Sequence, residues 1–181
     1  MRWRSPGRDS VENVFVGLGS NVGDRLGFLR SAVQELGKLP TTSIVRVSSI
    51  YETEPVGKKD QPSFLNMVVE LVSTLDVSQF HCQCKEIEHR IGRTRSERWG
   101  PREIDLDLLY FGRERVSDGR VVVPHPEIAN RKFVLVPMSE IAPEWIDPVR
   151  QVSIAQMLMA CDDRSGVTKT PYTTYTNFVE A

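Results

Sequence analysis

The chain of 181 residues lacks the features of a membrane protein or a secreted protein. No apolar run approaches the roughly 18 residues that a membrane-spanning helix needs, so we expect no membrane association. The amino-terminal stretch MRWRSPGRDS contains no apolar signal segment, which favours a cytoplasmic protein. The net charge of −1 gives no general attraction to nucleic acid, so any anion-binding site must be local.

Cysteine is scarce, and its spacing does not predict a metal centre. Cys82, Cys84 and Cys161 cannot all pair with one another, which favours a reducing compartment with free thiols. His81 next to Cys82 resembles a ligand pair, but this segment is expected to be helical. Residues two apart on a helix point to different sides, so we do not expect them to share a metal.

Two common nucleotide-binding motifs are also missing. No GxxxxGK[ST] sequence occurs, which excludes a P-loop kinase. The stretch GLGSNVG at residues 17–23 imitates a dinucleotide fingerprint, but its third glycine is one residue late. We interpret these glycines as positions where the backbone passes close to another segment or to a ligand at the sheet edge.

Hydrophobic spacing predicts one α+β domain over residues 13–163, preceded by a disordered arm at 1–12 and followed by a polar tail at 164–181. The predicted order is β-α-β-β-α-β. This ferredoxin-like succession gives an antiparallel sheet with both helices on one face. Predicted strands cover residues 14–19, 44–51 and 64–74 and a segment from 104; predicted helices end near residues 36 and 91, and a hairpin around 118–119 and a helix near 154–160 follow.

Charged residues of both signs are concentrated in ERWGPREIDLDLLYFG, residues 97–112. A strand that begins near Ile104 places Asp105 and Asp107 on one face, opposite the helices or at the rim of the sheet. The other face would carry Ile104, Leu106, Leu108 and Tyr110. Two carboxylates about 7 Å apart along a strand repel each other and resist desolvation, so a cation such as Mg²⁺ carrying phosphate oxygens is expected between them.

Arginines cluster next to these carboxylates, at positions 93, 95, 98 and 102. Their guanidinium forks match phosphate oxygens, which favours phosphoryl chemistry. A structural salt-bridge network between arginines and aspartates is the competing interpretation. His125, held between two prolines, could donate to a phosphate oxygen, and Asn66 within an apolar strand could read the polar edge of a flat heterocycle.

These motifs together resemble the 6-hydroxymethyl-7,8-dihydropterin pyrophosphokinase family, whose members move pyrophosphate from ATP to a pterin alcohol. The resemblance runs from about residue 14 to 148 and implies a ferredoxin-like α-β-α sandwich. Its most specific motif is RWGPREIDLDLLYFG, supported by LGSNVGD, YETEPVG, DQPSFLN and VPHPEIANRKFVLVP.

The resemblance implies a role for each charged residue of the site. Asp105 and Asp107 match residues that hold two Mg²⁺ ions together with the ATP phosphates, and Arg93 and Arg102 would assist them in catalysis. Val122 and Pro126 depart from the family pattern, standing where some members have a threonine and an aromatic residue. The positions that match nucleotide contacts are Glu88, Arg93, Arg95, Trp99, Arg102, Arg120, His125 and Arg131, with Glu88 and Arg120 toward the nucleoside.

A second set of positions matches the pterin site of the family. Phe64 and Phe133 would sandwich the ring, Asn66 would hydrogen-bond its edge, and Trp99 would close over it. Loops around residues 20–25, 54–63 and 92–101 resemble the mobile loops of the family. The full set is Thr53, Glu54, Val56, Phe64, Asn66, Trp99, Asp105 and Phe133, in which residues 53–56 contribute mainly backbone.

Two alternatives are weighed against this interpretation. Another Mg²⁺-dependent nucleotide enzyme on the same fold would use the carboxylates and arginines, but would leave Asn66 and the two phenylalanines unexplained. An RNA-binding module would need aromatic and basic residues on the third strand, which residues 64–71 lack. We therefore expect ATP and 6-hydroxymethyl-7,8-dihydropterin as partners, and no nucleic acid.

Overall fold

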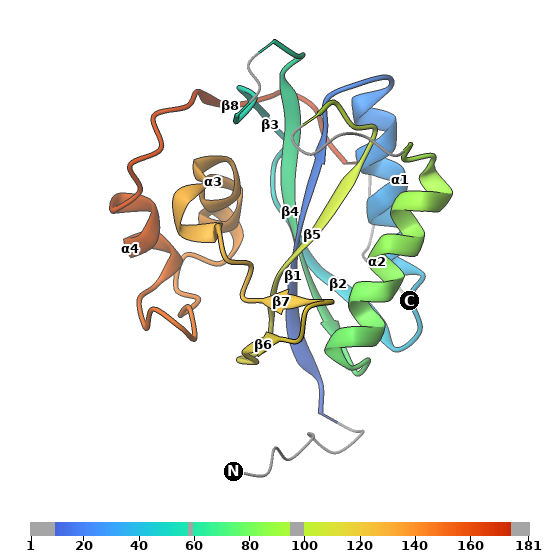
Figure 1. The fold of residues 1–181 in the computed structure, drawn as a ribbon, viewed down its shortest axis with the longest axis vertical. Helices are drawn as coiled ribbons and strands as arrows, with labels where there is room; N and C mark the ends of the chain where they lie inside the picture. Colours follow the sequence, from blue (N-terminus) through green and yellow to red (C-terminus); the bar gives the residue numbers. More distant parts are fainter. Residues whose placement is uncertain (1–9, 58–59, 95–99, 175–181) are drawn as a thin grey trace.

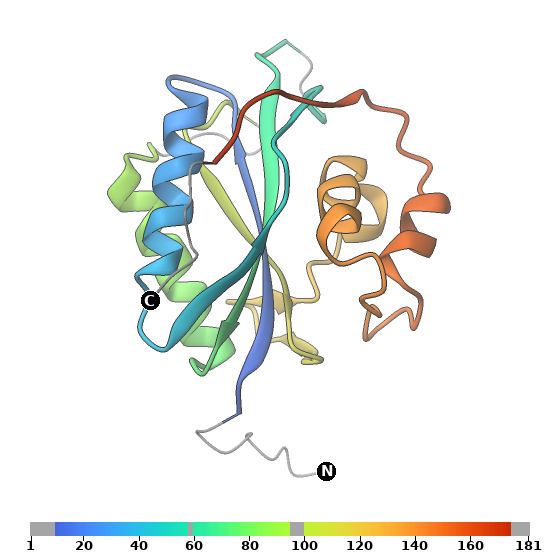
Figure 2. The same cartoon turned by 180° about the vertical axis from the view of Figure 1, so that it is seen from behind.

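A six-stranded β-sheet lies between two layers of helices in the computed structural model, which describes residues 10–57, 60–94 and 100–174 (Figures 1 and 2). Helices α1 and α2 cover one face of the sheet, and α3 and α4 lie on the other. The strands are β1 (Glu12–Ser20), β2 (Thr42–Val47), β3 (Tyr51–Thr53), β4 (Phe64–Ser73), β5 (Asp105–Phe111) and β8 (Val167–Lys169). The helices are α1 (Arg25–Gly37), α2 (Val77–Ile91), α3 (Lys132–Ile141) and α4 (Ile154–Met159).

The strand order confirms the ferredoxin-like prediction. β5, β1 and β4 are neighbours, and β2 and β3 both pair with the remaining edge of β4. All of these pairings are antiparallel. Together with the outer helices α3 and α4, this sheet forms the predicted α-β-α sandwich. A small hairpin of β6 (Val116–Ser117) and β7 (Val122–Val123) surrounds Asp118 and Gly119, as predicted, and is followed by a 3-10 turn, η1 (Ile128–Asn130).

The two long helices begin and end where their sequences provide caps. The Asp24 side chain accepts a hydrogen bond from Gly27 N at the start of α1, and Asp76 forms a capping box with Gln79 at the start of α2. α2 ends at Gly92, whose φ of 108° is a left-handed conformation that glycine adopts without strain. The residues that both helices bury against the sheet include Leu29, Val33, Leu36, Phe80, Cys84 and Ile87.

The segment predicted as one strand at residues 44–51 is divided into β2 and β3. Between them the Ser48 side-chain oxygen accepts the hydrogen bond of Val68 N. A side chain thus replaces a backbone carbonyl, which ends the regular ladder with β4. β3 is therefore a separate short strand that pairs with β4, with Tyr51 opposite Asn66.

The prediction that Tyr110 lies on the same face of the sheet as Leu106 and Leu108 is wrong. It packs with Phe15, Leu109 and α3 in the core on the far side of the sheet from Leu106 and Leu108. The β1–β5 register shifts between Phe15 and Val16, so that Leu108 pairs with Val16 and Tyr110 with Phe15. A β-bulge of one extra residue reverses the alternation beyond that point.

The segments outside the predicted domain are partly ordered. β1 already begins at Glu12, within the predicted arm, whereas residues 1–9 lie outside the described residues. Residues 167–169 of the predicted tail form β8, which pairs antiparallel with β3. In the described part of the chain, no helix is both long and apolar enough to cross a bilayer.

Candidate active site

A cavity between the sheet and the start of α3 gathers residues from five separate segments of the chain. Its floor is formed by β1 and β4, one side by the end of β3, and the opposite side by α3. Most of the predicted pterin residues line it, although they are far apart in the sequence. The predicted site residues among its lining are Thr53, Glu54, Val56, Phe64, Asn66, Arg102, Asp105, Asp107, Arg131 and Phe133.

Asn66 is fixed at the floor of this cavity. It is 6% exposed, and its Nδ2 donates to Thr53 Oγ1 over 2.6 Å. Gly19 lies beside it on β1, and a methyl group at Gly19 would stand 2.7 Å from Asn66 Oδ1. Because real Cβ atoms do not approach oxygen so closely, glycine is needed here to leave room for the amide. This agrees with the interpretation of the glycines as points of close backbone approach.

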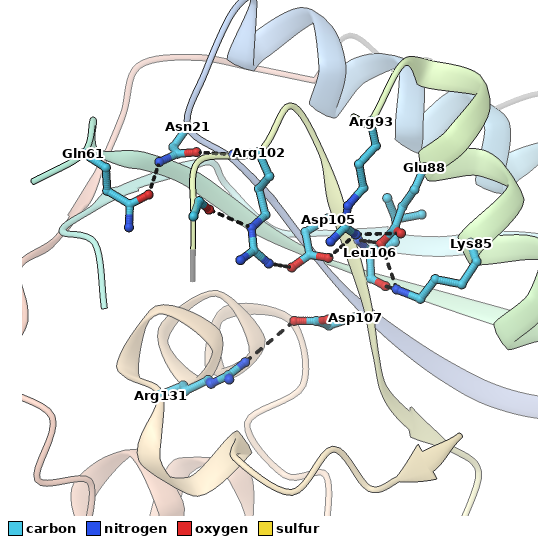
Figure 3. A network of polar contacts seen from close by, with 11 residues as sticks. Asn21, Gln61, Lys85, Glu88, Arg93, Arg102, Asp105, Leu106, Asp107 and Arg131 are labelled. Atoms are coloured by element: carbon cyan, nitrogen blue, oxygen red, sulfur yellow. Dashed lines mark hydrogen bonds and ion pairs between the residues drawn. The ribbon is translucent and has the colours of Figure 1, made fainter. Parts of the chain in front are cut away.

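The two aspartates of β5 have unequal partners (Figure 3). Asp105 accepts from Arg93 over 2.7 Å and from Arg102 over 2.6 Å, with one guanidinium on each carboxylate oxygen. Burial opposes ionisation of Asp105, but Arg102 and Arg93 outweigh it, and its pKa falls below the usual range. Asp107 pairs with Arg131 over 3.7 Å. Burial and the charge of Asp105 raise the pKa of Asp107.

A salt-bridge network therefore exists, as the competing interpretation proposed, but among the described residues its short ion pairs go to Asp105, whereas Asp107 has one longer pair with Arg131. Asp107 is left with excess negative charge in a half-buried position, where a cation would favour its ionised form. No group of three or more histidine, cysteine or carboxylate side chains suited to a metal occurs among the described residues. A metal ion at Asp105 and Asp107 would need further ligands beyond these two side chains, such as phosphate or water oxygens.

Glu88 ties α2 to β5 rather than standing free. It is 4% exposed, and its Oε1 accepts from Leu106 N over 2.7 Å and from Lys85 over 2.9 Å. Its Oε2 pairs with Arg93 over 2.7 Å (Figure 3). In the free protein both oxygens are engaged, so Glu88 holds Arg93 and the aspartate strand in position.

A second cavity opens on the other side of Asp107, between α2, β5 and the β6–β7 hairpin. Its lining residues are His81, Lys85, Leu106, Asp107, Leu108, Val121, Val122, His125 and Pro126. Val122 and Pro126, which depart from the family pattern, thus both border this cavity. Arg120, in contrast, lies exposed at the hairpin turn and lines neither cavity.

His125 enters the second cavity as a neutral donor. Its Nδ1 accepts from Glu127 N over 3.2 Å, which leaves the ring proton on Nε2. Burial and the nearby Arg131 charge lower the pKa of His125 from 6.5 to about 4. The imidazole can therefore donate one hydrogen bond at neutral pH without carrying charge.

One residue of the hydrogen-bond network around the first cavity was not predicted from the sequence, and two predicted site residues lie outside the described part of the chain. Asn21 donates to Gln61 and to Pro62 O, each over 3.1 Å, and accepts from Arg102 N over 2.8 Å. It thereby joins three loops around the first cavity. The only sequence signal for Asn21 was its place in LGSNVGD. Arg95 and Trp99 lie outside the described residues.

Fold and site together define a class of protein: a ferredoxin-like α-β-α sandwich with a carboxylate pair among arginines where two cavities meet. The sequence model of the 7,8-dihydro-6-hydroxymethylpterin-pyrophosphokinase (HPPK) family matches residues 15–143. The chain belongs to this family.

Individual relatives agree with the family match. A 2-amino-4-hydroxy-6-hydroxymethyldihydropteridine pyrophosphokinase of Bacillus subtilis (strain 168) is 47% identical over 127 residues, which cover 70% of this chain and 76% of that protein. The protein of the same name from Synechocystis is 39% identical over 147 residues, covering 81% and 75%.

Solved structures show the same fold. A Plasmodium falciparum HPPK-DHPS structure with pterin and p-hydroxybenzoate superposes with a TM-score of 0.64 at 14% identity. The superposition covers 84% of this chain but only 42% of that longer chain.

Proposed function

We propose that this protein transfers pyrophosphate from ATP to the hydroxymethyl group of 6-hydroxymethyl-7,8-dihydropterin, giving AMP and the pterin diphosphate. One observation carries the proposal: among the described residues, Asp107 is the residue that lines both cavities. A pterin in the first cavity and a nucleotide in the second would therefore meet at this carboxylate. Family membership supports both the donor and the acceptor.

The first cavity has the chemistry of a pterin site. Phe64 and Phe133 offer aromatic faces to a flat ring, and Asn66 offers an amide to its polar edge. The Thr53 hydroxyl holds that amide in a fixed orientation, so little side-chain freedom is lost on binding. We assign the ring to this cavity, with its hydroxymethyl arm directed toward Asp105 and Asp107.

The second cavity would hold ATP. Neutral His125 can donate to a phosphate oxygen from Nε2, while Leu108 and Val121 supply apolar walls. Arg131 and Arg102 face the junction of the two cavities, where the phosphates would lie. Their guanidinium groups neutralise the charge that develops as the phosphoryl group is transferred.

Asp105 and Asp107 fit a magnesium site. In the part of the chain that the structure describes, Asp107 has one ion pair, the 3.7 Å pair with Arg131, and carboxylate oxygens are the ligands that Mg²⁺ prefers. We propose that two Mg²⁺ ions bind here with ATP. When bound, they would neutralise phosphate charge and make the acceptor hydroxyl more acidic. Arg93 and Arg102 would keep Asp105 ionised and correctly turned for this role.

In the transfer itself, the hydroxymethyl oxygen forms a bond to the β-phosphorus of ATP. The bond between that phosphorus and the oxygen bridging to the α-phosphate breaks, and AMP leaves with the electron pair. The hydroxyl proton passes to solvent water, so that the alcohol and ATP give the diphosphate ester, AMP and one proton. The residues of the two cavities promote this transfer mainly by holding the two substrates in line and by balancing charge. Phosphoryl transfer depends on these two effects more than on a strong base.

The proposal is tested by incubating the protein with MgATP and the pterin alcohol and measuring nucleotide products. AMP should form only when both substrates are present. The matched control is 6-methyl-7,8-dihydropterin, which fits the same cavity but lacks the attacking oxygen. EDTA should stop AMP formation, and added Mg²⁺ should restore it. ADP as the product, or no AMP from folded protein, would overturn the proposal.

A further inference from the structure

The carboxyl-terminal segment from Asp163 to Thr170, which we call the strap, is hydrogen-bonded to Lys132 of α3 and to Glu54, which lines the first cavity, and it lies outside the region that the family match covers. That match ends at residue 143. The strap follows α4 and runs past α3 to the outer edge of the sheet, where β8 lies beside β3 (Figures 1 and 2). It therefore spans the two walls of the cavity, α3 on one side and β3 on the other.

The strap is attached to α3 at the residue between two site residues. Asp163 Oδ2 accepts from Lys132 N over 3.0 Å, and Asp163 Oδ1 accepts from Ser165 N over 2.9 Å. Lys132 stands between Arg131 and Phe133, which both line the first cavity. Asp163 thus fixes the first turn of the helix at the point where it presents the guanidinium and the aromatic ring.

Three residues later the strap is attached to the opposite wall. Gly166 O accepts from Glu54 N over 3.3 Å, and Thr170 N donates to Ile50 O over 2.9 Å. Between these bonds, β8 pairs with the whole of β3, with Thr53 opposite Val167. Thr53 is the residue that holds the Asn66 amide.

β3 is poorly suited to hold this position by itself. It has three residues, and β4 covers only one of its edges. Without the strap, the outer backbone groups of β3 would face water, and short edge strands are prone to fray. Glu140 on α3 adds support from the same side, because it accepts from Tyr51 Oη over 2.8 Å and pairs with Lys169 over 3.6 Å.

We propose that the strap is a positioning element for the pterin: it fixes the separation between the Phe133 wall and the Thr53 wall. This inference rests on the proposed function and deepens it. Among the described residues, none of the strap lines the second cavity, and the hydrogen bonds that attach the strap go to Lys132, Glu54, Ile50 and β3. Its loss should therefore weaken pterin binding selectively and leave nucleotide binding intact.

Each attachment can be weakened by one substitution with a matched control. Asp163→Ala removes the bond to Lys132 N, and Asp162→Ala makes the same charge change at the exposed neighbouring residue. Alternation of hydrogen-bonded pairs makes Glu52 and Thr168 a bonded pair. Thr168→Pro hence removes a backbone donor to β3, whereas Thr168→Ala keeps it.

The readout is the dissociation constant of each ligand, measured by calorimetry with the pterin alcohol and with Mg²⁺ and an ATP analogue that cannot be cleaved. Asp163→Ala and Thr168→Pro should each raise the pterin constant about 3- to 10-fold, the value of one net hydrogen bond. The nucleotide constant should stay within about twofold, as should both constants in the control variants. In turnover, KM for the pterin should rise while KM for ATP does not.

Two results would overturn the inference. An equal loss of affinity for both ligands, together with a lower melting temperature, would mean that the strap only supports the fold. Unchanged pterin affinity in Asp163→Ala, which keeps the strand and is expected to fold, would mean that the strap positions nothing. A failure of the proposed function looks different, because the unaltered protein would then bind no pterin and release no AMP.

Discussion

The substitution Gly19→Ala tests the close packing at the floor of the first cavity. A methyl group at position 19 would stand 2.7 Å from Asn66 Oδ1, so the amide must move. Asn66 cannot move without lengthening its 2.6 Å bond to Thr53 Oγ1, because both residues are buried. The perturbation is thus aimed at one amide whose orientation the proposed function requires.

The size of the effect follows from that bond. A buried polar group that loses its partner costs about 1 to 3 kcal/mol. If the hydrogen bond between the Asn66 amide and the polar edge of the pterin is lost at the same cost, the dissociation constant of the pterin rises about 5- to 150-fold. Replacing glycine by alanine also restricts the unfolded chain, which returns about 0.4 to 1 kcal/mol of stability. The free energy of unfolding should therefore change less than the binding free energy does.

Gly17→Ala is the matched control. Gly17 lies two residues earlier on the same face of β1 and also lines the first cavity, but a methyl group there would meet Leu109 at 3.5 Å, an ordinary contact, and would not touch Asn66. Pterin affinity, measured by calorimetry, should stay within about threefold of the unaltered protein because no bond is broken. If Gly19→Ala binds the pterin as tightly as Gly17→Ala does, the amide of Asn66 does not read the ligand.

Four other predictions use single groups. Asp107→Ala should nearly abolish AMP formation while the circular dichroism spectrum stays native, because the junction of the cavities loses the carboxylate that is proposed to hold the metal; near-normal AMP production would refute the metal assignment. Phe133→Ala should weaken pterin binding by about 1 to 3 kcal/mol if the ring stacks, and unchanged calorimetric affinity would count against stacking. His125 should titrate near pH 4 when followed by NMR. The folding stability gained by keeping the imidazole neutral is therefore present above pH 6.5 and is lost as the pH falls toward 4. A titration midpoint of 6.5 or higher would contradict the burial of His125. Cys82 should be alkylated in the native protein and Cys84 only after unfolding, since burial raises the pKa of Cys84 to about 12; equal labelling rates would show that α2 opens readily.

The sequence predicted those parts of the fold that depend on local spacing. Leu29, Val33 and Leu36 recur at helical intervals and are buried together, and the order of strands and helices was predictable for the same reason. The reversal at Tyr110 was not, because a single extra residue in β5 depends on its pairing with β1 and leaves no trace in the alternation.

β8 was also beyond prediction. The three residues Val-Thr-Lys have little hydrophobic character, and the segment becomes a strand only because the edge of β3 is available. Its assignment to a polar tail followed from composition alone. Tertiary pairing decides such short strands, and composition does not reveal it.

The site was predictable to the extent that its residues lie in motifs. Asp105, Asp107, Asn66 and Phe133 were named from sequence, and the structure brings them to one cavity. The unequal pairing of the two aspartates was not predictable, because it depends on where three arginines reach from: Arg93 just after α2, Arg102 in the loop before β5, and Arg131 at the N-cap of α3. Lys85 was missed since its only signal was a spacing of three from Glu88.

The central claim is that a pyrophosphoryl group crosses from one cavity to the other at Asp107. The most direct measurement is the mass and amount of both products after one reaction with MgATP and 6-hydroxymethyl-7,8-dihydropterin. We predict AMP and a pterin diphosphate in equal amounts, with both transferred phosphorus atoms derived from the β and γ positions of ATP. ADP together with a pterin monophosphate would contradict the account.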